Sequence, residues 1–213
     1  MRPTRIRDKN MKQFKTVTIL TLIVSALFLA GCYKEDESSK KKSGFTSPEE
    51  YIENPSVIKA INESDIPVYQ GTNPPALAGT YILNGYITDV SSALYKLMGR
   101  PIQTEFIFSK QTNSGKIDCE ERAGGIKVSG SGGYITGNNG RFTIYQESRQ
   151  SGTEAGLPNG VSITVVLLMS GTKSSNGNLV NVEGISIITE VNNSQYKSAE
   201  GGWWKWEANF YLQ

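Results

Sequence analysis

The chain has 213 residues, of which 22 are basic, 20 acidic and none is histidine. The absence of histidine excludes Ser-His-Asp and Cys-His catalysis, histidine-ligated zinc or haem, and the commonest general base near neutral pH. Catalysis would have to depend on carboxylates, Lys or Tyr, and we expect a non-enzymatic protein with no metal and no cofactor.

Residues 1–31 have the pattern of a cleaved bacterial export signal. Six basic residues precede or flank an apolar run, VTILTLIVSALFLA, that extends from Val17 to Ala30. A membrane-spanning helix needs about 20 apolar residues, and this run has 14. A short apolar core behind a basic start favours a signal over a span. Met1 and Met11 are both candidate starts, because MKQFK alone supplies a basic region.

The motif Leu29-Ala30-Gly31-Cys32 resembles the lipobox of bacterial lipoproteins. The resemblance implies a diacylglycerol on the Cys32 sulfur and cleavage before Cys32. Each buried CH₂ group contributes about 0.8 kcal/mol, so two acyl chains would anchor the protein without a polypeptide span. The alternative is an ordinary secretory signal with an accidental cysteine. We expect an exported protein, lipid-anchored to the outer membrane on its periplasmic face or at the cell surface.

Residues 32–45 are predicted to form a disordered tether, because this charged, serine-rich tract cannot bury a core. Lys34 followed by three acidic residues resembles the surface-export signal of Bacteroidota lipoproteins, and a plain solvated linker is the alternative. Removing residues 1–31, with six basic and one acidic side chain, leaves 16 basic and 19 acidic residues, a net charge of −3. A nucleic-acid partner is not expected, since such proteins normally carry a clustered basic face.

Residues 46–70 are predicted to contain two short helices. The sequence SPEE at 47–50 combines an N-cap, a proline at the first helical position and a capping-box glutamate. Asn54 followed by proline repeats the signal, and Val57, Ile58 and Ile61 then share one helical face. We expect this apolar stripe to pack on the main domain or to close one end of it.

Residues 71–213 have the pattern of a β domain. Strand-like runs alternate with turns rich in Gly, Asn and Ser, and Asn139-Gly140 and Asn176-Gly177 are strong hairpin signals. Residues 89–99 differ, because their apolar spacing predicts a short helix that ends at Gly99. The eight predicted strands are residues 80–88, 102–110, 116–122, 126–136, 141–147, 161–172, 179–191 and 203–212.

Alternation along these runs predicts which side chains face inward. The last strand places Trp204, Trp206 and Phe210 on one face and Trp203 on the other, so Trp203 is predicted to be the exposed tryptophan. The sixth run has a continuous apolar face from Val161 to Met169. In the seventh run the apolar phase changes near Gly184, which predicts a β-bulge there.

About eight antiparallel strands must dispose of the two edges of their sheet. Closure into an up-and-down barrel removes both edges, and a two-sheet β-sandwich is the alternative. We therefore predict an all-β protein with an eight-stranded antiparallel barrel over residues 71–213.

Three segments resemble a group of uncharacterised bacterial lipoproteins with a lipocalin-like (calycin) domain. They are IPVYQGTNPPALAGTY at 66–81, GSGGYITGNNGRFTIY at 130–145 and LMSGTKSSNG at 168–177. The resemblance implies a barrel in the cell envelope and no settled activity. Lipocalins open with Gly-x-Trp, and this chain has Tyr81 where the tryptophan would stand.

Few residues suggest chemistry. Asp118, Glu120 and Glu121 surround Cys119, and this cluster reads as a cation site or an acid–base pair, or, as we expect, as a solvated strand face beside an inert thiol. The glycine-rich stretch 130–133 is followed by a strand, so its glycines are expected to permit barrel curvature and not to bind phosphate.

Aromatic side chains are the remaining candidates for contact with a ligand or partner. They could line a lumen that binds a small apolar or amphipathic ligand, or fill a solid barrel whose loops bind another envelope protein or a glycan. The candidate residues are Trp203, Trp204, Trp206, Tyr81 and Tyr134.

Overall fold

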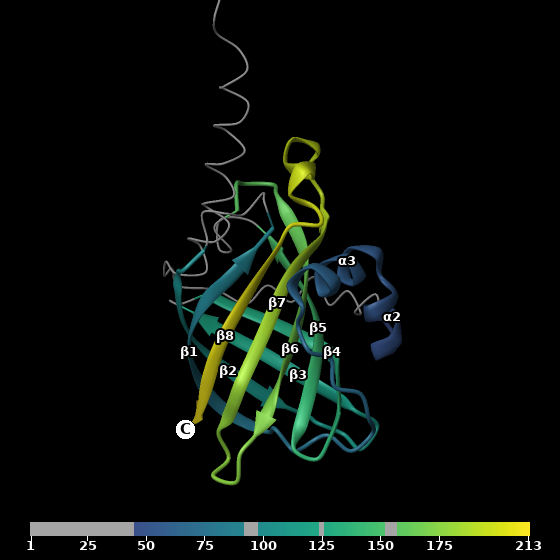
Figure 1. Cartoon of the computed structure of the whole chain (residues 1–213). Coiled ribbons are helices and arrows are strands. Elements are labelled where there is room, and N and C mark those ends of the chain that lie inside the picture. Colours follow the sequence, from purple (N-terminus) through teal and green to yellow (C-terminus); the bar gives the residue numbers. More distant parts are fainter. Residues whose placement is uncertain (1–44, 92–97, 124–125, 152–156) are drawn as a thin grey trace, which may run out of the picture.

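The computed structural model describes residues 45–91, 98–123, 126–151 and 157–213. Eight antiparallel strands form one closed barrel in which each strand pairs with the next along the chain and β8 pairs with β1 (Figure 1). The strands are β1 (Gly79–Val90), β2 (Pro101–Ser109), β3 (Lys116–Ala123), β4 (Ile126–Asn138), β5 (Arg141–Ser151), β6 (Ser162–Lys173), β7 (Leu179–Val191) and β8 (Trp203–Leu212).

The pairing of β8 with β1 closes the barrel. Its register runs from Tyr81 opposite Leu212 to Val90 opposite Trp204, with one irregularity between Ile87 and Asp89. Closure leaves neither of these strands with a free edge, which confirms the predicted barrel and excludes the two-sheet sandwich. All eight predicted strands are present, and their ends agree to within a few residues.

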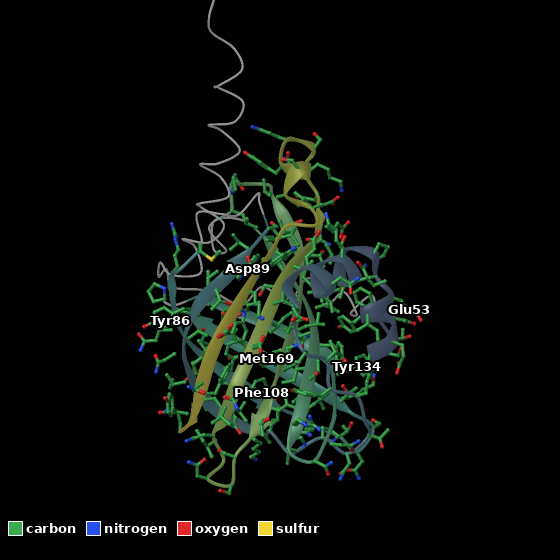
Figure 2. All side chains as sticks on the ribbon, viewed as in Figure 1. Glu53, Tyr86, Asp89, Phe108, Tyr134 and Met169 are labelled. Carbon is green, nitrogen blue, oxygen red and sulfur yellow. The ribbon has the colours of Figure 1, made fainter. Side chains whose placement is uncertain are left out.

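The barrel interior follows the predicted alternation on β6 and β8. Trp204, Trp206 and Phe210 point into the main core, while Ile163 and Val165 reach it from β6. Phe108 and Met169 are 2% and 0% exposed and belong to the same cluster (Figure 2). The period of two therefore identified the inner face of both strands.

The predicted bulge at Gly184 is wrong. The register irregularities on β7 lie between Leu179 and Val182, where Asn181 has a φ of 52°, and between Ile188 and Glu190. Gly184 instead leaves room for the Trp206 ring, because a Cβ atom at this position would lie 2.0 Å from that ring. The apolar phase appeared to change because Ile185 belongs to a second buried cluster on the outer wall of the barrel.

The two predicted helices are present as α2 (Pro48–Glu53) and α3 (Pro55–Ser64). The Ser47 hydroxyl accepts a hydrogen bond from the Glu50 amide (3.4 Å), and Asn54 Oδ1 accepts one from the Val57 amide (3.3 Å). Side-chain oxygens thus satisfy amides that a helix N-terminus leaves without partners, as the sequence predicted.

The helices cover the outer wall of the barrel, on the side of β4 to β7 (Figure 1). Tyr51 and Val57 are fully buried against that wall, whereas Ile58 is 41% exposed, so its predicted place in the packed stripe is wrong. Ala60 takes that place. The helices therefore pack on the main domain, as expected, and they do so on the outer wall of the barrel.

The segment from Tyr69 to Leu77, which follows the helices, lies against the barrel end that carries the β4–β5 turn. Thr72 forms a parallel bridge with Gly137, and the Tyr69 amide donates to the Thr143 hydroxyl (2.7 Å). Leu77 is fully buried in the main core, and its amide donates to Gln111 Oε1 (2.7 Å). This segment therefore fills one end of the interior.

Several predictions concern residues outside the described ranges. These are the signal, the lipobox and Cys32, the tether up to residue 44, and most of the helix predicted at 89–99. The connection between β7 and β8 contains a 3₁₀ helix, η4 (Ser194–Ala199), that was not predicted from the sequence. Among the helices described here, none combines the length and apolar character that crossing a membrane requires.

Candidate functional site: a cavity in the barrel

The interior has two halves. The filled half lies toward the β4–β5 turn and contains Leu77, Phe108, Phe142, Leu179 and Phe210. The cavity half lies toward η4 and encloses a cavity of about 60 Å³. All eight strands contribute to its lining: Leu83, Ile87, Ile102, Thr104, Phe106, Cys119, Glu121, Ala123, Val128, Gly130, Gln146, Ser148, Gln150, Val165, Leu167, Ser186, Trp204 and Trp206.

One part of the cavity wall is aromatic. Phe106 on β2 and Trp206 on β8 have ring centroids 6.5 Å apart, and Trp204 lines the cavity one pleat further along β8. Phe106 and Trp206 also contact Phe210, at 5.3 and 6.2 Å between centroids, which ties this wall to the filled half. The arrangement presents aromatic side chains to a ligand from a packed support.

Another part of the wall is polar, and it comes mainly from β5. Phe142 and Ile144 point inward at the start of this strand, so the same face next presents Gln146, Ser148 and Gln150. Because β5 is four strands from β1 in an eight-stranded barrel, this wall lies across the lumen from the seam of β1 with its neighbours β2 and β8. The cavity is therefore amphipathic.

Glu121 is the one acidic side chain among the described residues that line the cavity. Its cross-strand neighbours are Phe106 on β2 and Val128 on β4, which offer it no charge. Burial raises the pKa of this carboxyl to about 7, and the Thr104 hydroxyl offsets only part of that effect. The single hydrogen of that hydroxyl is shared with the Arg122 carbonyl oxygen (2.9 Å).

Gln146 is 3% exposed and lies across two glycines of β4. A Cβ atom at Gly130 would be 2.1 Å from Nε2 of Gln146, and one at Gly133 would be 2.5 Å from Oε1. Nε2 donates to the Glu147 carbonyl oxygen (2.9 Å), but Oε1 has no hydrogen-bond partner within the described part of the chain. The glycine-rich stretch thus makes room for an amide side chain at the cavity.

The predicted acidic cluster is divided by the alternation of β3. Asp118 and Glu120 face outward, where Asp118 pairs with Lys110 (2.8 Å) and Glu120 pairs with Lys127 (3.1 Å). Partial burial opposes these partners, yet they hold the pKa of both carboxyls below the usual values. The expectation of a solvated face is correct for these two residues and wrong for Glu121, which points inward.

Cys119 is buried and lines the cavity beside Glu121. Burial, followed by the negative charges of Glu121, Glu120 and Asp118, raises the pKa of its thiol well above the usual value. A thiol with a raised pKa is a poor nucleophile, which agrees with the inert thiol that we expected.

The structure separates the five candidate aromatic residues. Trp204 and Trp206 line the cavity, whereas Tyr81 is fully buried in the core, where desolvation raises its pKa. Tyr134 packs on the outer wall near α2, and its hydroxyl donates to the Thr46 carbonyl oxygen (Figure 2).

The predicted exposure of Trp203 is wrong. This side chain is 4% exposed in the outer-wall cluster, and its Nε1 donates to Glu63 Oε2 on α3 (3.0 Å). Alternation correctly turned it away from the lumen. The side chain is buried because α3 covers that part of the outer wall, which strand periodicity cannot reveal.

Sequence reasoning missed Glu121 and Gln146 as cavity residues, although a signal for each was present. Ile117 and Cys119 fix the inner face of β3 and place Glu121 on it. Phe142 does the same for Gln146 on β5. In each strand the signal was a polar residue at a position where the alternation calls for an inward-facing side chain.

A scan against protein-family models, a search of curated proteins and a search of solved structures each found no match to this chain.

Proposed function

We propose that this protein is a non-enzymatic, lipid-anchored cell-envelope protein that binds a small amphipathic ligand inside a calycin-like barrel. The observation that carries the proposal is the cavity, which eight strands line with aromatic rings on one part and polar groups on another. Pockets of this composition, with a few polar groups set among apolar walls, are typical of small-molecule sites.

The cavity volume limits the ligand. A buried water needs roughly 10–15 Å³ of such volume, so the 60 Å³ found here holds a few waters or a ligand of a few heavy atoms. Drug-sized ligands occupy roughly 300–1,000 Å³. A small polar molecule with a short apolar part therefore suits the cavity better than a long acyl chain.

Emission from the cavity tryptophans provides the test. Small amphipathic solutes such as propan-1-ol and propylamine should change the emission saturably, because Trp204 and Trp206 line the site. A Ser148→Phe variant should lose the response, since its added ring would occupy the cavity, while Ser174→Phe, in the β6–β7 turn, is the matched control. The absence of a saturable response to every solute would contradict ligand binding.

The anchor is tested independently. Leu29-Ala30-Gly31-Cys32 supports acylation of Cys32, and the lack of an aspartate at position 33 argues against retention in the inner membrane where that rule applies. Cys32→Ala should abolish labelling by radioactive palmitate and release the protein from membranes, whereas Cys119→Ala should change neither. Palmitate labelling that persists in Cys32→Ala would refute the anchor.

The filled half of the barrel favours a second candidate, a solid scaffold whose loops bind another envelope protein or a glycan. Phe108, Phe142 and Phe210 are at most 2% exposed, so side chains already occupy the lumen toward the β4–β5 turn. Under this alternative the Ser148→Phe variant would keep its partner. Under the first proposal it would lose its ligand.

A further inference from the structure

We propose that the ligand of the cavity carries a primary ammonium group, which pairs with the Glu121 carboxylate and donates a hydrogen bond to Oε1 of Gln146. This inference rests on the proposed function and names the ligand class. It follows from what two cavity-lining groups lack among the described residues: a donor for Oε1 of Gln146 and a counter-ion for Glu121.

The cavity has one acceptor that lacks a donor among the described residues. Gln146 uses Nε2 on the Glu147 carbonyl oxygen, which leaves Oε1 as a buried acceptor without a partner among the described residues. A buried polar atom without a hydrogen-bond partner destabilises the folded protein. An ionised Glu121 can only accept hydrogen bonds, so it adds to the same deficit. A ligand with several N–H donors satisfies both groups.

The described lining of the cavity also lacks a positive charge. The neighbouring outward acid Glu120 has two cationic partners, Arg122 and Lys127, whereas no Lys or Arg in the described ranges forms an ion pair with Glu121. The raised pKa of the Glu121 carboxyl is the expected result of burial without a counter-ion. A cationic ligand would return that pKa toward its ordinary value.

The aromatic wall selects an organic cation. Phe106, Trp204 and Trp206 line the same cavity, and aromatic rings attract an ammonium group. A hard metal ion would require six or more oxygen ligands, and the cavity supplies one carboxylate. The described residues contain no group of three His, Cys, Asp or Glu side chains suited to a metal.

The test uses three probes with one three-carbon body: propylamine, propan-1-ol and propionate. The protein is purified in the form that cells produce from the full chain. Binding of each probe is measured by calorimetry and tryptophan emission at pH 8. Propylamine should bind at least about 10-fold more tightly than propan-1-ol, because the alcohol leaves the Glu121 charge unpaired. Propionate should not bind.

Variants assign the effect to residues. Glu121→Gln keeps the shape of the side chain but removes the charge, and it should weaken propylamine binding at least about 10-fold. Gln146→Met removes the Oε1 acceptor and should weaken binding by a smaller factor of about 5, in line with the loss of one hydrogen bond. Glu120→Gln, one residue away but facing outward, is the matched control and should bind propylamine like the parent.

The pH dependence provides a separate readout. A primary alkylamine stays protonated at neutral pH, since its pKa is near the value of about 10.4 for lysine. Propylamine binding should therefore weaken below pH 7 and fall up to about 100-fold between pH 8 and pH 5, as the empty site's carboxyl becomes protonated. Glu121→Gln should remove this dependence.

The titratable groups near the cavity point to Glu121 as the group that causes this pH dependence. Glu121 and Cys119 are the titratable residues of the described lining, and the raised pKa of the thiol keeps it protonated across this range. The charged residues that face outward from the strands around Glu121 include Glu105, Asp118, Glu120, Arg122 and Lys127.

A primary amine can arrive free in solution or on a lipid headgroup. A second arm therefore replaces the soluble probes with vesicles of phosphatidylethanolamine, with phosphatidylglycerol vesicles as the control. Selective association with the ethanolamine vesicles that Glu121→Gln abolishes assigns a headgroup ligand. Binding of propylamine alone assigns a free amine, and either result supports the inference.

Two other outcomes are distinguishable. If propan-1-ol binds as tightly as propylamine and Glu121→Gln leaves both unchanged, the ammonium inference is overturned while ligand binding stands. If no probe and neither vesicle binds, the proposed function falls together with the inference. Near-UV circular dichroism of Glu121→Gln establishes that a loss of binding comes from a folded variant.

Discussion

The two halves of the barrel interior are built on the same eight strands. They differ in the side chains that those strands direct inward. On β5 the inner face begins with Phe142 and Ile144 and continues with Gln146, Ser148 and Gln150. The filled half consists of interlocked apolar side chains. Among the described residues, the cavity half has a carboxyl without a counter-ion and an amide oxygen without a donor. One half thus maintains the fold, and the other carries polar groups that a stable core would not retain.

The largest expected effect is in the filled half. Phe210→Ala should lower the free energy of unfolding by about 3–5 kcal/mol, because the fully buried ring contacts Phe106 and Trp206. Ser148→Ala in the cavity half should change it by less than about 1 kcal/mol. Chemical denaturation measures both. Equal losses for the two variants would show that the halves do not differ in their contribution to stability.

The next effect has the opposite sign and lies in the cavity half. The folded protein holds the Glu121 proton up to about pH 7, while the unfolded chain releases it near the ordinary pKa of 4.5, so stability falls as pH rises through that window. Glu121→Gln should therefore stabilise the ligand-free protein by up to about 3 kcal/mol at pH 8 and by nothing at pH 4.

Denaturation of Glu121→Gln and its parent at pH 4, 6 and 8 checks this prediction. Glu120→Gln is again the control, and its difference from the parent should have the other sign, since ion pairs lower the pKa of Glu120. A variant as stable as its parent at all three pH values would mean that Glu121 is solvated like a surface carboxylate.

A smaller effect is expected where a glycine makes room for the aromatic wall. Gly184→Ala should destabilise by about 1–3 kcal/mol, because its Cβ would lie 2.0 Å from the Trp206 ring. Gly130→Ala should cost less, since the group it meets is the flexible end of Gln146, which can move. Thermal unfolding ranks the two variants. A larger loss for Gly130→Ala would indicate a rigidly held Gln146.

The smallest expected loss of stability comes from a substitution outside the barrel, which leaves both halves of the interior unchanged. Trp203→Phe removes the hydrogen bond to Glu63 on α3 and should lower the free energy of unfolding by about 1 kcal/mol. Propylamine binding should not change, because Trp203 points away from the lumen. Altered binding would show that the outer wall and the cavity are coupled.

The fold was largely predictable because its signals are local. A period of two along each strand, the hairpin sequences Asn139-Gly140 and Asn176-Gly177, and the caps Ser47 and Asn54 each act within a few residues. Closure followed from the need to satisfy two sheet edges. The cavity was less predictable. Glu121 was grouped with the acidic residues next to it in the sequence, although the alternation of β3 places it on the inner face.

By itself, the sequence determined the number of strands, their order, the caps of both helices and the face that each tryptophan of β8 presents. The tertiary structure alone decided that α3 buries Trp203, that Gly184 accommodates Trp206, and that Glu121 and Gln146 line one cavity. The physical reason is the range of the interactions. Backbone periodicity is set by adjacent residues, whereas burial and missing hydrogen-bond partners depend on groups distant in the chain that only the closed barrel brings together.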